Sequence, residues 1–79
     1  MFKVIFGMNE VGTHSNLKDA LRQFVKITKD EISKGGMSLQ VLETACWIEG
    51  PKYPPLMFQR IKELAYEEGV INDRGETIE

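Results

Sequence analysis

The sequence has few of the reactive groups from which enzymes and metal sites are built, with one cysteine and one histidine among 79 residues. A single cysteine excludes an intramolecular disulfide, and this cysteine and histidine together cannot form a structural zinc site within one chain. The sequence also has no long apolar run, and its first residues lack the apolar core and cleavage site of a signal peptide. We therefore expect a cytoplasmic protein that uses no metal and no cofactor and does not enter a membrane.

A strong excess of charge of either sign is missing as well. The 10 basic and 12 acidic side chains give a net charge of −2, unlike the basic balance of a dedicated nucleic-acid-binding protein. The hydrophobic fraction of 42% and the charged fraction of 28% are typical of a folded globular chain. We expect one domain over residues 1–79, with a core that supplies only about 3–5 kcal/mol of net stability.

The first half of the sequence predicts a strand, a loop and a long helix. Residues 2–7 alternate and are rich in β-branched and aromatic side chains, which favours a strand, and residues 7–15 read as a loop. Asn16 can cap a helix, with Asp19 three residues further on, and Gly35 can end it. An apolar stripe at helical spacing supports this helix and consists of Leu17, Leu21, Phe24, Thr28 and Ile32.

The second half is less clear. Residues 39–49 fit a helix capped by Ser38 or a strand, and we favour the helix because the strand would bury Glu43. A helix over residues 56–68 and a hairpin over residues 70–78 follow. The predicted class is α+β in the order β-α-α-α-β-β. A two- or three-stranded sheet, made from the N-terminal strand and the C-terminal hairpin, would pack against two or three helices.

The segment from Gly7 to His14 has the glycine spacing of a phosphate-binding loop between a strand and a helix. It lacks the chemistry of that loop, because Thr13 replaces the phosphate-binding lysine and Glu10 would repel a phosphate. An ordinary connection is the better interpretation of this segment.

Cys46 and His14 form the one possible nucleophile–base pair of the cysteine type. Cys46 lies in the apolar stretch Ala45-Cys46-Trp47-Ile48, so a buried structural cysteine is favoured over a reactive one. We therefore expect no catalytic residue, and a small enzyme or enzyme subunit that uses this pair is the third hypothesis.

Basic residues gather on the first helix. Lys18, Arg22 and Lys29 fall in a narrow sector opposite the apolar stripe, with Lys26 just beyond it. Together with Arg60 and Lys62, they are candidates for contact with an anion or a nucleic acid. The alternative interpretation is a solvated helix face, balanced by acidic neighbours.

Residues 56–79 are similar to the recognition helix and wing of winged-helix domains, since a helix ending in Glu67-Glu68-Gly69-Val70-Ile71 precedes a tight turn and a short strand. This resemblance implies a nucleic-acid-binding module in which Gln59, Arg60 and Lys62 would face DNA. The sequence departs from such a surface at Glu63, Glu67 and Glu68, which would repel the phosphate backbone.

Three aromatic residues bracket the proline-rich loop at residues 50–55, namely Trp47, Tyr53 and Phe58. Exposed aromatic side chains commonly anchor protein partners. The leading hypothesis is therefore a non-catalytic regulatory or binding module that contacts a protein partner, or a second copy of itself, through this loop and a helix face. Nucleic-acid binding is the second hypothesis.

Overall fold

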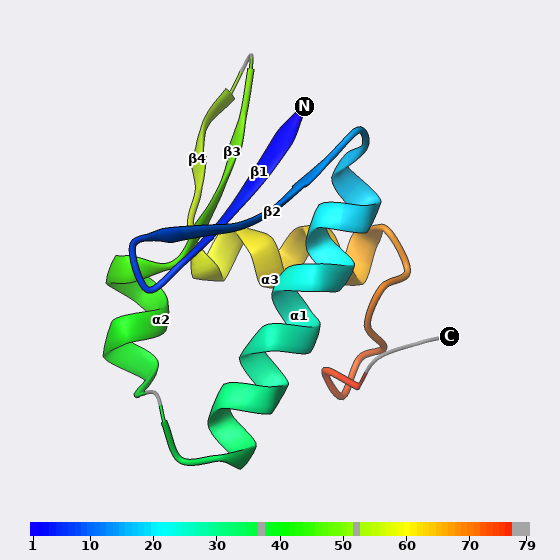
Figure 1. The fold of residues 1–79 in the computed structure, drawn as a ribbon. Helices are drawn as coiled ribbons and strands as arrows, with labels where there is room; N and C mark the ends of the chain where they lie inside the picture. The colour runs from blue at the N-terminus through cyan, green and yellow to red at the C-terminus, as the bar shows by residue number, and fades with distance from the viewer. Residues whose placement is uncertain (37, 52, 77–79) are drawn as a thin grey trace.

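The computed structural model describes residues 1–36, 38–51 and 53–76 and confirms the α+β class. One antiparallel four-stranded sheet, in the order β2-β1-β3-β4, is covered by helices (Figure 1). The elements along the chain are β1 (Phe2–Phe6), β2 (Asn9–His14), α1 (Leu17–Ser33), α2 (Leu39–Ala45), β3 (Trp47–Gly50), β4 (Tyr53–Leu56) and α3 (Phe58–Glu67). The sheet is therefore larger than predicted, because β2 and β4 come from segments that we expected to be loops and β3 from the end of a segment that we expected to be helical.

A tight hairpin replaces the loop predicted over residues 7–15. Phe6 pairs with Asn9, so Gly7 and Met8 alone form the turn between β1 and β2. Their φ angles of 62° and 70° are both positive, as a type I′ turn requires. Strand β2 was not predicted because its residues are mostly exposed and do not alternate between apolar and polar.

Met8 adopts a backbone conformation that a side chain disfavours, and its own side chain is 70% exposed. We expect Met8→Gly to raise the free energy of unfolding by about 0.5–1 kcal/mol, because glycine has no Cβ to strain in this region. Urea denaturation measures the change. Met8→Ala is the control, since it removes the same side chain and keeps the strain. Equal stabilities for the two variants would contradict the explanation.

The partner predicted for the first strand was wrong. β1 pairs with β2 on one side and with β3 on the other, where Val4 lies opposite Ile48, and it does not pair with residues 70–76 of the described C-terminal part. The helix favoured for residues 39–49 is confirmed over α2 only, with the Ser38 hydroxyl accepting a hydrogen bond from the Val41 amide at 3.4 Å. The chain is extended at Cys46 and continues directly into β3.

The residues after α3 form a turn that packs under the helices. Val70 and Ile71 are buried, and the Asn72 amide donates to the Glu76 carbonyl at 2.9 Å, which closes the turn. Within residues 70–76 the structure has no strand of the sheet, and the second arm of the predicted hairpin, residues 77–78, lies outside the described residues. Helix α3 also begins later than predicted, at Phe58, because Leu56 still belongs to β4.

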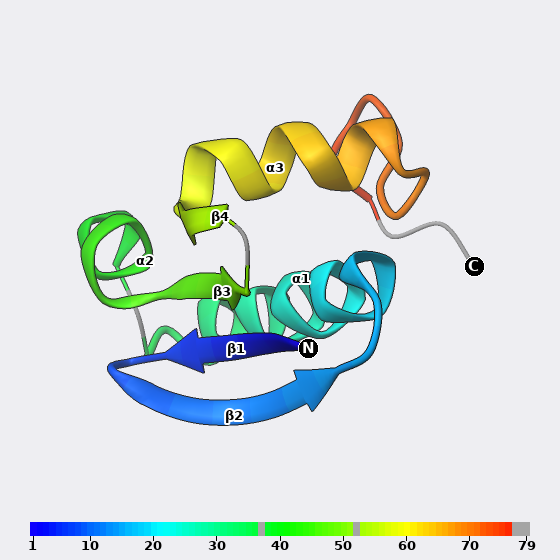
Figure 2. The same ribbon diagram turned by 90° about the horizontal axis from the view of Figure 1, so that it is seen from above.

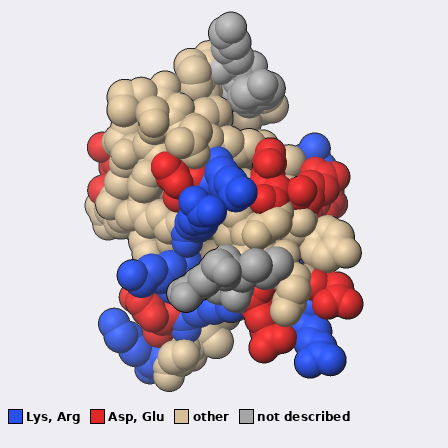
Figure 3. Space-filling view, turned by 90° about the vertical axis from the view of Figure 1, so that its right-hand side faces the viewer, with Lys and Arg blue, Asp and Glu red and all other residues tan. Residues whose placement is uncertain are grey.

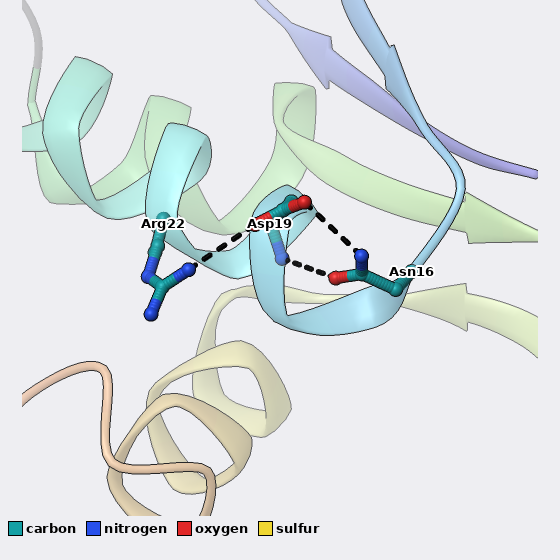
Figure 4. A network of polar contacts seen from close by, with 3 residues as sticks. All are labelled: Asn16, Asp19 and Arg22. Carbon is teal, nitrogen blue, oxygen red and sulfur yellow. Dashed lines mark hydrogen bonds and ion pairs between the residues drawn. The ribbon is translucent and has the colours of Figure 1, made fainter.

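Helix α1 begins where the sequence predicts. The Asn16 side-chain oxygen accepts a hydrogen bond from the Asp19 amide at 2.9 Å, and the Asp19 carboxylate contacts Arg22 (Figure 4). The helix runs unbroken through Thr28, whose hydroxyl donates to the Phe24 carbonyl at 2.8 Å. Helix α1 is therefore one uninterrupted element of 17 residues that packs against α3.

The core lies between one face of the sheet and helices α1 and α3, which pack against each other (Figure 2). Side chains alternate along a strand, so Val4 and Ile48 point into this core while Ile5 and Trp47 lie on the opposite face. Among the described residues that are fully buried, Phe24 has the largest side chain, and it meets Phe6 edge to face with ring centroids 5.3 Å apart.

Both outer strands of the sheet are irregular. Pro54 and Pro55 lie on β4 and lack the amide hydrogens that would pair with a further strand. On β2 the register skips Val11, because Val4 lies opposite Gly12 and Ile5 opposite Glu10. The Val11 carbonyl instead accepts a hydrogen bond from the Gln23 side chain of α1 at 3.1 Å. A different irregularity on each outer strand therefore hinders pairing with a further strand.

Within the described parts of the chain, no helix combines the length and the apolar composition that crossing a membrane requires.

Candidate functional site

An apolar groove of about 220 Å³ lies between α1, α3 and the turn that follows α3. We call it the α1–α3 groove. Its α1 wall consists of Phe24, Val25, Thr28, Lys29 and Ile32, its α3 wall of Phe58, Ile61 and Lys62, and its remaining side of Ile71 and Gly75. The groove forms where α1, from the first half of the chain, lies beside α3 and the turn that follows it, from the second half.

The walls of the groove are almost entirely apolar. Phe24, Ile61 and Ile71 are buried and belong to the core, so the groove opens directly onto packed side chains. The Thr28 hydroxyl already donates to a backbone carbonyl of its own helix and offers no unpaired hydrogen. Ile32 was predicted to face the core but is 56% exposed at the edge of the groove. This position leaves an apolar side chain available for contact.

One cation flanks each wall of the groove. Lys29 lines it from α1 and Lys62 from α3, and the Lys62 ammonium group lies 5.7 Å from the centre of the Phe58 ring. Such a contact with an aromatic face is favourable and restrains the lysine beside the apolar surface. The groove therefore combines an apolar interior with a basic edge.

Lys29 of the basic stripe lines this groove beside Phe24, Thr28 and Ile32 of the apolar stripe, so the prediction that Lys29 lies opposite that stripe was wrong. Val25, Lys29 and Ile32 all line the groove, and Lys18 and Arg22 continue the same line at helical spacing. We call these five residues the α1 ridge. Its apolar members, Val25 and Ile32, lie four and three residues from Lys29. The sequence shows this combined spacing, but the prediction used only the charged residues.

Acidic side chains accompany part of this basic surface. Arg22 contacts Asp19 at 3.2 Å, and Arg60 contacts Glu63 at 2.9 Å, each one turn apart on its own helix. Figure 3 shows basic and acidic side chains interspersed on this face, below a region of strands with few charges. Exposed pairs of this kind contribute little to stability but lower the local positive charge.

The three aromatic residues predicted to bind a partner do not converge. Phe58 lies in the groove, whereas Trp47 lies on the far face of the sheet, where its indole donates to Glu49 at 2.9 Å. The side chain of Tyr53 is outside the described part of the structure. The groove residues that sequence reasoning missed are Val25, Ile61 and Ile71, since each looks like an ordinary core residue when its helix or turn is considered alone.

Cys46 and His14 lie at opposite ends of β1. The Cys46 sulfur accepts a hydrogen bond from the Gly7 amide at 3.5 Å, just after β1 ends, whereas His14 pairs with Phe2, where β1 begins. At about 3.3 Å per residue, these two positions are roughly 17 Å apart along the strand. The two residues therefore do not form the nucleophile–base pair that the third hypothesis needs.

The His14 ring is held by Gln23. The Gln23 side-chain nitrogen donates to the Val11 carbonyl, so its oxygen is the acceptor that faces Nε2 of His14. Nε2 must then carry a hydrogen, and its hydrogen bond to Gln23 connects β2 to α1. The residues resembling a phosphate-binding loop form this hairpin instead of a strand–loop–helix unit, and the described residues contain no cluster of three potential metal ligands.

Burial raises the pKa of the Cys46 thiol above its usual value, and the hydrogen bond from Gly7 opposes this shift only in part. We expect a thiol reagent to modify Cys46 slowly, at a rate that follows global unfolding, because the side chain is fully buried. Rapid modification of the folded protein would contradict this expectation.

The same shift predicts a pH dependence. The raised pKa adds stability below the unfolded-state pKa of about 8.5, and this contribution disappears as the pH rises through the folded-state value. Urea denaturation above pH 8 should show the loss in the wild type and not in Cys46→Ala.

No known protein family, curated protein or solved structure matches this chain. The geometry of the α1–α3 groove is therefore the basis for inferring its function.

Proposed function

We propose that the protein is a small non-catalytic binding module that acts through protein–protein contacts, with the α1–α3 groove as its site. The size of the groove carries this proposal. Its volume of about 220 Å³ lies below the roughly 300–1,000 Å³ of sites for drug-sized ligands and cofactors. A space of this size fits one or two large apolar side chains, which a protein partner would insert.

The chemistry of the groove also favours binding over catalysis. Among the described residues that line it, only Lys29 and Lys62 are titratable, and no thiol, imidazole or carboxylate accompanies them. Apolar walls with a polar edge are the usual anatomy of a small protein-binding pocket. A cytoplasmic protein partner is therefore the occupant that we expect.

Selection from a displayed library of random peptides tests this proposal. The wild type should enrich peptides that share a large apolar residue, and Ile32→Asp should lose them because it places a charge at the edge of the groove. Val41→Asp is the matched control, since Val41 is an exposed aliphatic residue on α2. Absence of enrichment, or enriched peptides that bind the Ile32→Asp variant equally well, would overturn the proposal.

Nucleic-acid binding is the second candidate, favoured by the three cations of the α1 ridge and by Lys62 beside them. A backbone contact by these residues would make affinity fall steeply with salt. Binding of DNA or RNA with such a dependence would support this candidate, and absence of binding at about 50 mM salt would remove it.

A further inference from the structure

We infer that the partner segment of this binding module is an acidic amphipathic helix that lies along the α1 ridge and inserts its apolar face into the α1–α3 groove. The inference rests on the proposed function and specifies the partner. Three observations carry it: the order of residues on the ridge, the length of the ridge, and the sign of the charges around the groove.

The α1 ridge consists of three cationic and two apolar residues in the order Lys18, Arg22, Val25, Lys29, Ile32. Spacings of four, three, four and three residues keep all five on one side of the helix. A second helix alongside it presents residues at the same spacing, so apolar and acidic side chains can each meet their counterpart. An extended peptide, with its two-residue period, does not match this spacing.

The ridge is long enough for such a partner. The 15 residues from Lys18 to Ile32 are separated by 14 rises of 1.5 Å and so span about 21 Å, or about four turns of a helix. The groove occupies the half of the ridge that contains Val25 and Ile32. An apolar residue of the partner would fill the groove there, and its acidic residues would continue along the ridge toward Lys18.

The positive charges around the groove predict a partner with negative charge. The ridge contributes Lys18, Lys29 and Arg22, the last already in contact with Asp19 at 3.2 Å, and Lys62 adds a further cation from the opposite wall, where the Phe58 ring restrains it. An acidic helix would neutralise these cations and also cover Val25 and Ile32 with its apolar face. A nucleic-acid backbone would meet the cations but leave the apolar groove unfilled.

Two synthetic peptides of about 14 residues, with leucine at the same helical positions and either glutamate or lysine elsewhere, test the inference at 0.15 M salt, where the Debye length is about 8 Å. We expect the acidic peptide to bind at least about tenfold more tightly than the basic one, measured by fluorescence anisotropy. Amide chemical shifts should change on α1 and α3, and not on the open face of the sheet.

Charge reversal at matched sites locates the contact. Lys62→Glu should weaken binding of the acidic peptide by at least about fivefold, because it reverses a charge on the groove itself. Lys26→Glu makes the same change on α1 off the ridge, and its effect should stay below about twofold because solvent and salt screen it. Both residues are exposed, so circular dichroism should show both variants folded.

The outcomes separate this inference from the proposed function. Equal binding of the two peptides, abolished in both cases by Ile32→Asp, would overturn the charge preference and leave the binding module intact. Equal weakening by Lys62→Glu and Lys26→Glu would also overturn the inference, because the contact would then not involve the groove. If neither peptide binds, the helical partner is wrong, and the peptide library alone decides whether the groove binds proteins.

Discussion

Phe24→Ala is expected to remove most of the stability of this domain. The side chain is 1% exposed, contacts the Phe6 ring and forms the base of the α1–α3 groove. Truncation of a buried phenylalanine costs about 3–5 kcal/mol, because transfer free energy is lost and a cavity remains. A core of this size supplies a net stability of the same order, so the variant should lie near its unfolding midpoint in water at room temperature.

Urea denaturation followed by circular dichroism measures this effect. Phe58→Ala is the matched control, because it makes the same chemical change at a half-buried position and should cost clearly less. A loss below about 1.5 kcal/mol for Phe24→Ala would contradict the packing described for this core.

Gly12→Ala is expected to lower the free energy of unfolding by about 2 kcal/mol, through the loss of two hydrogen bonds. A Cβ at Gly12 would overlap with the side-chain amide of Gln23, which must then leave both His14 and the Val11 carbonyl. The connection between β2 and α1 would be lost, although neither element is shortened.

A double-mutant cycle with Gln23→Ala isolates this cause. Once the Gln23 amide is gone, the three atoms nearest to a Cβ at position 12 are removed, so Gly12→Ala should be neutral or slightly stabilising in that background. Equal costs in the two backgrounds, measured by urea denaturation, would show that the effect comes from the strand itself.

The sequence predicted those elements whose signals are local. Asn16 fixes the start of α1 by a bond to a residue three positions away, and Gly69 ends α3 with a φ of 74°. Strand β3 was missed because nothing in residues 47–50 shows that Val4 lies opposite Ile48. That pairing depends on segments more than 40 residues apart.

The candidate site was predictable only in part, for a related reason. The sequence showed the cations of the α1 ridge, but a helical projection cannot show which neighbour lies beside them. Ile32 looked like a core residue because its spacing matches the core stripe, yet α1 carries it to the edge of the groove. The groove itself requires α3 and Ile71, which come from the other half of the chain.

The prolines of β4 and the Val11 bulge of β2 bear on how this protein behaves when crowded. Filaments of the amyloid type grow by adding strands to a straight border whose amide hydrogens and carbonyls are all available. Neither border of this sheet meets that condition. The folded domain is therefore expected to resist polymerisation at high concentration. A binding partner is expected to contact the helices and not an edge of the sheet.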